Sequence, residues 1–106
     1  MTGMDDRRDA FEKKFAHDAD LRFKAEARRN KLLGLWAAEL LGKKDGEAEA
    51  YAKEVVAADL EEAGDEDVFR KIRADFDAAG VNETDAAIRE KMIVLMEEAI
   101  RQVNQD

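Results

Sequence analysis

The stretch LLGLWAAELL, residues 32–41, is almost wholly apolar, and Glu39 is its only charged residue. A helix that is apolar on most of its sides has to be covered on most of its sides. We therefore expect this stretch to lie at the centre of a bundle of helices. The rest of the chain favours the same fold class. It contains no proline, and its 42% charged and 45% hydrophobic residues suit long helices with charged outer faces.

Glycines mark the expected helix ends in this proline-free chain. Helix C-termini and connections are predicted at four of them, namely Gly42, Gly46, Gly64 and Gly80. Between them apolar residues recur at helical spacing, which predicts helices over about residues 20–41, 47–63, 66–79 and 83–103. Short connections favour antiparallel neighbours. The prediction is an all-α fold, a compact up-and-down four-helix bundle over residues 20–106, whose short third helix is the candidate for a crossing angle.

The pattern also assigns residues to the core and to the helix ends. The inward face of the first helix is predicted to consist of Leu21, Ala25, Leu32, Trp36 and Leu40, and that of the third of Val68, Phe69, Ile72 and Phe76. Asp65 is expected to cap the third helix, and Asn82 or Thr84 the last one, because such side chains accept hydrogen bonds from the free amides of a first turn. Gly34 costs about 1 kcal/mol relative to alanine inside a helix, which indicates close approach of a neighbour.

A separate amphipathic helix is predicted upstream, over about residues 5–18 of an N-terminal segment that comprises residues 1–19. Its narrow apolar side consists of Met4, Phe11 and Phe15, and the basic residues on the rest of its circumference include Arg7, Arg8, Lys13 and Lys14. An isolated helix shorter than about 12 to 15 residues is marginal in water. Burial of two phenylalanines four residues apart would offset part of the cost of ordering it. We expect a mobile segment, suited to partner binding rather than chemistry, that folds on docking.

The net charge of −8 is divided unevenly along the chain. Residues 1–31 contain nine basic and seven acidic residues, whereas residues 32–106 contain nine basic and nineteen acidic ones. An acidic protein lacks the basic footprint on which phosphate contacts depend, so nucleic acid is not an expected partner. The asymmetry has two interpretations. Either the basic end meets a partner while the acidic body keeps the protein soluble, or charged helices simply vary in sign.

The sequence offers few residues for metal, cofactor or covalent chemistry. It has no cysteine, and its single histidine, His17, lacks companion ligands for zinc. A structural role beside Asp18 is the simpler interpretation of His17, with pH-dependent binding as the alternative. Neither a phosphate-binding glycine motif nor the Glu-x-x-His motif of di-iron bundles occurs. Acidic clusters such as Glu61 and Glu62 are typical of solvated faces. We therefore predict no catalytic residue, no cofactor and no metal, and hence a protein that is not an enzyme.

Membrane insertion is not expected either. No run approaches the roughly 18 consecutive apolar residues that a spanning helix needs, and the N-terminal sequence lacks the apolar stretch of a signal peptide. These features predict a cytoplasmic protein without direct membrane insertion.

Three runs of the sequence are distinctive as a set. The first is AFEKKFAHDADLRFKAEARRNKLLGLWAAELLG at residues 10–42, and the others are YAKEVVAADLEEAG at 51–64 and VFRKIRADFDAAG at 68–80. Together they resemble the zeta subunit family, the small ATPase inhibitor of the F1F0-ATP synthase of alphaproteobacteria. The resemblance covers nearly the entire chain, so it exceeds a short-motif coincidence.

The resemblance implies a four-helix body preceded by an inhibitory segment, which becomes helical as it enters a catalytic interface between the alpha and beta subunits of F1-ATPase. The inserted helix would act as a wedge that blocks ATP hydrolysis, and the central-stalk gamma subunit is a further candidate contact. Carried over to the matched residues, Phe11 and Phe15 are apolar anchors, and the candidates for charged contacts are Arg7, Arg8, Lys13 and Lys14. The implied location is cytoplasmic and peripheral to the membrane-bound enzyme.

Two other classes of function stay open at this point. A helical adaptor or assembly factor would bind another protein through the same N-terminal helix without inhibiting an ATPase, and its recovered partners would lack F1 subunits. A small hydrolase using buried carboxylates would need an acidic pair whose mutation abolishes a measured turnover.

Overall fold

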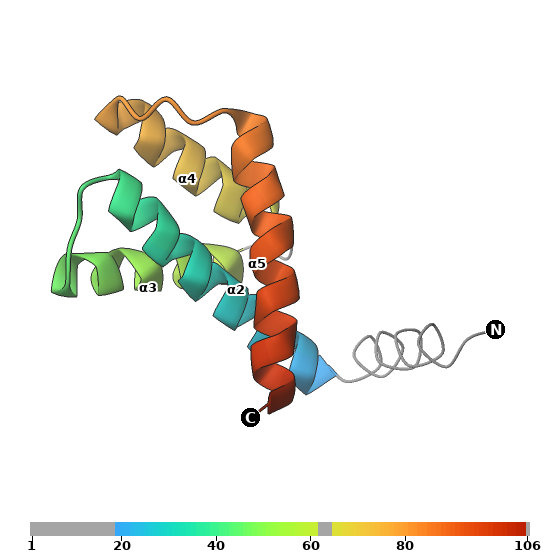
Figure 1. The fold of residues 1–106 in the computed structure, drawn as a ribbon. Helices are drawn as coiled ribbons and strands as arrows, with labels where there is room; N and C mark the ends of the chain where they lie inside the picture. The colour runs from blue at the N-terminus through green and yellow to red at the C-terminus, as the bar shows by residue number, and fades with distance from the viewer. Residues whose placement is uncertain (1–18, 62–64, 106) are drawn as a thin grey trace.

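The computed structural model describes residues 19–61 and 65–105 of the protein. These residues form four helices, α2 (Ala19–Leu40), α3 (Gly46–Glu61), α4 (Glu66–Ala79) and α5 (Asp85–Gln105) (Figure 1). The prediction of an all-α four-helix bundle is confirmed. The helix predicted over residues 5–18 lies outside the described residues.

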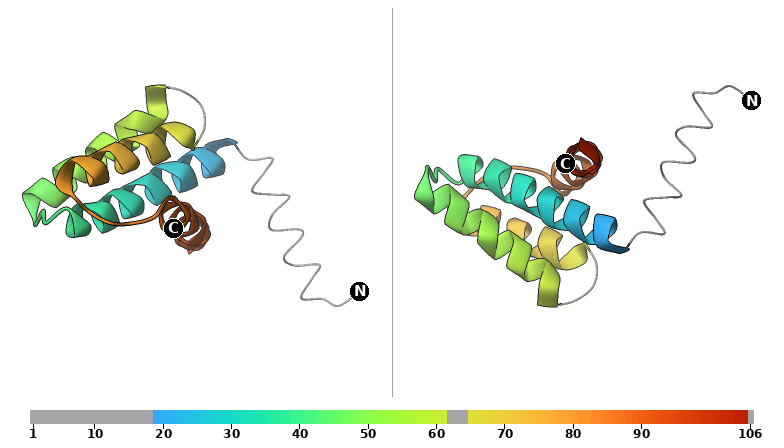
Figure 2. Two further views of the ribbon diagram at one scale, coloured as in Figure 1. Left: turned by 90° about the horizontal axis from the view of Figure 1, so that it is seen from above. Right: turned by 90° about the horizontal axis from the view of Figure 1, so that it is seen from below.

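One helix crosses the other three at a steep angle. In both views of Figure 2, α2, α3 and α4 run in roughly one direction, whereas α5 is seen nearly end-on. The predicted candidate for a crossing angle was the short third helix, so the structure corrects this detail. The reason lies in the apolar residues of α5, because Ile88 and Met92 pack into the main core while Val103 packs beside Ala25 in a second cluster. The helix therefore spans both clusters rather than lying alongside one of them.

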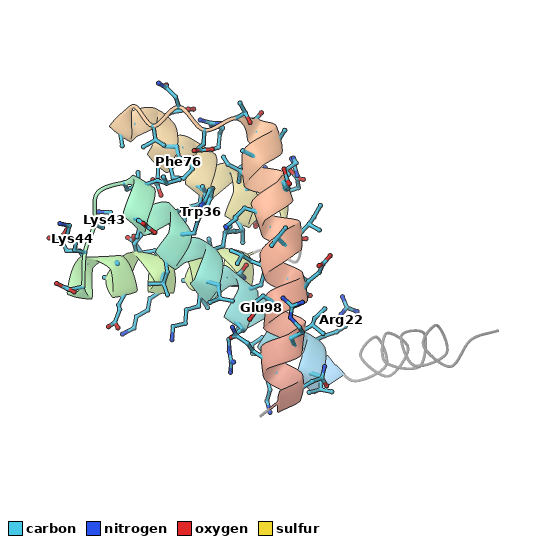
Figure 3. The ribbon with its side chains drawn as sticks, viewed as in Figure 1. Arg22, Trp36, Lys43, Lys44, Phe76 and Glu98 are labelled. Atoms are coloured by element: carbon cyan, nitrogen blue, oxygen red, sulfur yellow. The ribbon has the colours of Figure 1, made fainter. Side chains whose placement is uncertain are left out.

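The main core is built around residues of the apolar stretch 32–41. Leu33, Ala37 and Ala38 have no exposed surface, and Trp36 meets Phe76 of α4 edge to face with 5.7 Å between ring centroids (Figure 3). Contacts of this kind are favourable beyond the area that they bury. The middle of the stretch, from Leu33 to Ala38, therefore lies in the main core, whereas Glu39 and Leu40 at its end are exposed.

The buried face of α2 differs from the predicted one. Leu21, Leu32 and Trp36 are only partly buried, and Leu40 is 38% exposed. Both α3 and α5 pack on α2. Its buried face is therefore centred on Leu33 and Ala37, and each of these directly follows a residue of the predicted face, Leu32 or Trp36, in the sequence. The predicted inward face of α4 agrees better, since all four of its predicted core residues are buried.

At Gly34, α2 lies close against α3. A Cβ atom at this position would lie 2.6 Å from the Cα of Ala52 and 3.1 Å from its Cβ. The predicted close approach is thus confirmed, and its partner is the backbone of α3.

The helix ends follow local hydrogen-bonding rules with one exception. Gly80 ends α4 in the left-handed conformation, with φ of 73°, which glycine adopts without steric cost. Thr84 caps α5, because its Oγ1 accepts a hydrogen bond of 3.0 Å from the Ala87 amide. Asp65 precedes α4 but makes no side-chain cap, so the predicted cap is wrong, and its carboxylate has the partner described below. None of the described helices is long and apolar enough to cross a membrane.

Candidate partner-binding surface

The predicted site residues lie outside the part of the chain that the structure describes. They are Met4, Arg7, Arg8, Phe11, Lys13, Lys14 and Phe15, and His17 lies outside it as well. The structure therefore neither brings these residues together nor separates them. It does describe the helix that directly follows them, because α2 begins at Ala19.

The first turns of α2 present a basic surface with one aromatic ring. Arg22, Phe23 and Lys24 are all exposed, and Phe23 has 61% of its surface open to solvent. Among the side chains that the structure describes, Phe23 is the only exposed aromatic. Arg22 lies at the end of the molecule where α2 begins (Figure 3), and its Nη2 is 3.7 Å from Oε1 of Glu26. The sequence-based prediction assigned Phe23 no role, although it follows Phe15 at a spacing of eight residues in the sequence.

The opposite side of these turns is held by α5. Ala25 and Val103 form a buried pair, and the partly buried apolar residues packed on it are Leu21, Met96 and Ile100. A hydrogen bond of 3.3 Å joins Nη1 of Arg28 to Oε1 of Gln102. These contacts fix the direction in which the chain enters the bundle from its N-terminal segment.

A buried polar network lies in the next turn of α2. Arg29 and Asn30 are 2% and 1% exposed, and Nε of Arg29 donates to Oδ1 of Asn30 at 2.7 Å. The Arg29 Nη2 atom donates to Oδ1 of Asp65 at 2.8 Å. A buried guanidinium is costly unless it is paired, which explains why the Asp65 carboxylate binds Arg29 instead of capping α4. The network thereby fastens the middle of α2 to the start of α4.

A second polar cluster joins α3 to α4. The Tyr51 hydroxyl donates to Oδ2 of Asp75 at 2.7 Å, and Nζ of Lys71 donates to the same oxygen at 3.1 Å. Burial, followed by the hydrogen bond to Asp75, raises the pKa of Tyr51 well above its ordinary value. The hydroxyl therefore stays protonated and serves as a donor. This arrangement fastens two helices and supplies no reactive group.

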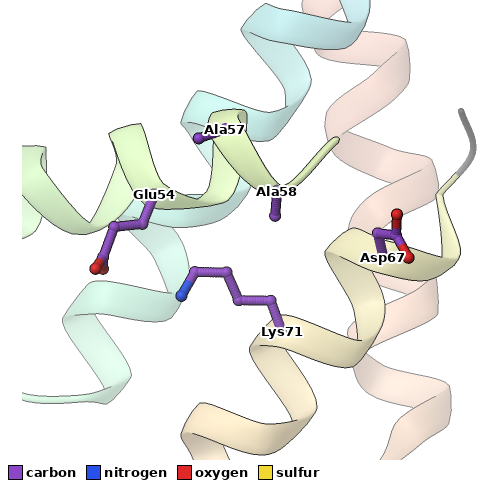
Figure 4. Close-up of a pocket in the computed structure, with 5 residues that line it drawn as sticks. All are labelled: Glu54, Ala57, Ala58, Asp67 and Lys71. Carbon is purple, nitrogen blue, oxygen red and sulfur yellow. The ribbon is translucent and has the colours of Figure 1, made fainter. Parts of the chain in front are cut away.

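A pocket of about 360 Å³ opens between α3 and α4 beside this cluster. Its lining comes from Glu54, Ala57 and Ala58 of α3 and from Asp67 and Lys71 of α4 (Figure 4). Two of its charged groups already have partners, since Asp67 accepts from Arg70 at 2.7 Å and Lys71 donates to Asp75. The pocket thus presents no nucleophile paired with a base, which the chemistry of a hydrolase would need.

Exposed ion pairs connect α4 to α5. Arg89 donates two hydrogen bonds, of 3.0 and 3.2 Å, to the carboxylate of Glu66, and its guanidinium lies 4.0 Å from the ring centroid of Phe69. The hydrogen bond from Arg89 lowers the pKa of Glu66. Pairs as exposed as this one stabilise a protein only slightly. Within residues 19–61 and 65–105, no cluster of acidic or histidine side chains is suited to holding a metal ion.

Comparisons with known proteins agree with this non-catalytic picture. The family model described as ATPase inhibitor subunit zeta matches residues 1–102. A protein whose structure was solved by solution NMR is 54% identical to this chain, with a match that covers 80% of this chain and 96% of that one at a TM-score of 0.72. No curated protein matches the chain. The chain belongs to the ATPase inhibitor subunit zeta family, and it is therefore a non-catalytic regulator that binds the ATP synthase.

Proposed function

We propose that the chain inhibits ATP hydrolysis by inserting residues 1–19 into a catalytic interface between the alpha and beta subunits of F1-ATPase. The observation that carries this proposal is the extent of the family match, which begins at residue 1 and so includes the N-terminal segment as well as the helical body. The central-stalk gamma subunit is a further candidate contact. Binding in this way would keep the chain on the cytoplasmic side, peripheral to the membrane.

The apolar and the basic side chains of the N-terminal segment are suited to different roles in binding. Phe11 and Phe15 are four residues apart, so they share one face of a helix and can enter an apolar pocket together. Desolvated aromatic anchors commonly dominate binding energy, whereas charges at the rim tune association rate and salt dependence. We therefore assign affinity to the two phenylalanines and steering to the four basic residues, Arg7, Arg8, Lys13 and Lys14.

The described body supports a separate inhibitory element. Its apolar residues are largely used within the bundle, and two charged residues of its α3–α4 pocket, Asp67 and Lys71, have partners in Arg70 and Asp75 outside the pocket lining. The body also holds the start of α2 against α5. It is thus suited to carrying and orienting the segment that precedes it.

The test is a titration of the full chain into purified F1-ATPase with ATP hydrolysis as the readout. We expect hydrolysis to fall as the chain binds, and a chain lacking residues 1–18 to lose inhibition while α2 remains intact. Phe11→Ala combined with Phe15→Ala should weaken inhibition in the full-length chain. Ile93→Ala, a substitution of an exposed aliphatic residue on α5, is the control that should leave inhibition unchanged.

Two results would contradict the proposal. Unchanged hydrolysis at saturating and verified binding would exclude inhibition and favour an adaptor. A fall of several degrees in Tm for Phe11→Ala or Phe15→Ala would show that the residue packs into the body, because loss of a buried contact lowers stability.

A further inference from the structure

We propose that the surface that binds the ATP synthase continues from the N-terminal segment onto the first turns of α2, with Phe23 as an anchor. This inference rests on the proposed function, and it adds a residue of the described body to the binding surface. The partner chemistry is an apolar pocket bordered by carboxylates on a protein of the ATP synthase.

Phe23 is placed for contact with another molecule. Its neighbours Leu21 and Ala25 face the cluster with α5, and two residues along a helix correspond to a rotation of about 200°. Phe23 therefore lies on the opposite side of α2 from that cluster, where 61% of its surface is exposed. An aromatic ring held on a rigid helix loses little freedom on binding, which favours affinity.

The spacing of Phe23 from other apolar residues in the sequence distinguishes it from an ordinary exposed apolar residue. Single exposed hydrophobic residues are common and need no function, as Ile93 on α5 illustrates with 63% exposure. Phe23, however, completes a series with a spacing of four residues that contains Phe11, Phe15 and Ala19. In a continuous helix, successive members of such a series are displaced by only about 40° and form one ridge. A partner that binds the N-terminal segment as a helix continuous with α2 would therefore meet Phe23 on the same ridge as Phe11 and Phe15.

Charge indicates the chemistry of the surface that would receive the ridge. Arg22, Lys24 and Lys31 are exposed on α2, and neither lysine forms an ion pair in the structure described here. Residues 32–106 carry a strongly negative net charge, whereas residues 1–31 carry a small positive one, so a net positive charge is found only in the N-terminal part of the chain. A partner surface with carboxylates around an apolar pocket would complement both the ring and the cations.

The contacts behind Phe23 keep it in position. Ala25 is buried against Val103, and Arg28 is hydrogen-bonded to Gln102. Because α5 holds the inner side of these turns, the ring is presented without rearrangement of the body. Replacement of Phe23 should therefore affect binding and leave folding unchanged.

The experiment compares Phe23→Ala with Ile93→Ala in the full-length chain. The two residues have nearly equal exposure but lie on different helices. For each variant we would measure Tm, the Kd for purified F1-ATPase and inhibition of ATP hydrolysis. We expect Phe23→Ala to weaken binding by at least about tenfold, Ile93→Ala to stay within about twofold of wild type, and both to keep the wild-type Tm. Binding of Phe23→Ala within twofold of wild type would overturn the inference.

A charge reversal at Lys24 tests the acidic nature of the partner surface. Lys24→Glu should slow association and reduce the salt dependence of binding. An unchanged association rate at low salt would show that the partner surface facing Lys24 is not bordered by carboxylates.

These measurements separate the inhibitory function of the chain from the role of Phe23 in binding. If the wild-type chain inhibits and Phe23→Ala inhibits equally well, the inference about α2 is wrong while the inhibitory function stands. If the wild-type chain binds without inhibiting, the inhibitory function is wrong, and the Kd of Phe23→Ala still decides the role of the ring. An absence of any binding would overturn both.

Discussion

The bundle contains two hydrophobic clusters, which differ in size and in what they hold. The main cluster includes residues from all four described helices, among them Leu33, Val55, Phe76 and Ile88. The second joins only the beginning of α2 to the end of α5, around Ala25 and Val103. Hydrophobic stabilisation grows with the apolar area buried, so the main cluster should determine global stability. The second determines where the first turns of α2 point, and hence how the proposed binding surface is presented.

The largest effect is expected from truncation at the centre of the main cluster. Leu33→Ala should lower the free energy of unfolding by about 2–5 kcal/mol, because it removes buried methyl groups and leaves a cavity. Thermal and denaturant unfolding would measure the loss. Leu40→Ala, on the same helix but partly exposed, is the control and should cost much less. If Leu40→Ala were instead the more destabilised of the two, the buried face of α2 would be the one predicted from sequence.

The difference between Leu33 and Leu40 shows how far the sequence could predict the fold. Helical periodicity and glycine positions correctly predicted four helices and the core residues of α4, because α4 is amphipathic with a single apolar stripe. In α2 the apolar run covers more than one side, so periodicity could not select which leucines face inward. That choice depends on two neighbours, α3 and α5, whose crossing angle is a tertiary property.

Polar residues were harder to predict than apolar ones. The burial of Arg29 became understandable only when Asp65, 36 residues later, was seen to accept its hydrogen bond. For the same reason Asp65 was predicted as a cap, since local rules contain no information about distant partners. The candidate site followed from sequence only for the N-terminal segment. Phe23 could have been included, because its spacing from Phe11 and Phe15 was visible, but its exposure required the structure.

A smaller and pH-dependent effect is expected at Tyr51, the polar edge of the main cluster. Tyr51→Phe should cost about 0.5–1.5 kcal/mol at neutral pH through loss of the hydrogen bond to Asp75. The folded-state pKa of Tyr51 is raised above the ordinary value of 10.0. Its stabilising contribution is therefore complete below pH 10 and is lost as the pH rises above that value.

Alkaline titration of the unfolding free energy would measure this contribution. Tyr51 is the only tyrosine of the chain, so the difference between wild type and Tyr51→Phe isolates it from the titration of lysines. The wild type should lose more stability than the variant above pH 10. Parallel curves over that range would show that the hydroxyl is not buried against Asp75.

The smallest global effect is expected in the second cluster, around Ala25 and Val103. Val55→Ala and Val103→Ala remove the same two methyl groups, one from each cluster, and both valines are buried. Val103 lies near the end of α5 in a cluster that can open locally, so its truncation should cost about 1 kcal/mol or less and Val55→Ala distinctly more. Hydrogen exchange should accelerate in residues 21–25 for Val103→Ala while α3 and α4 stay protected. Equal losses, with faster exchange throughout the bundle, would mean that the two clusters unfold as one unit and that the start of α2 is no less stable than the core.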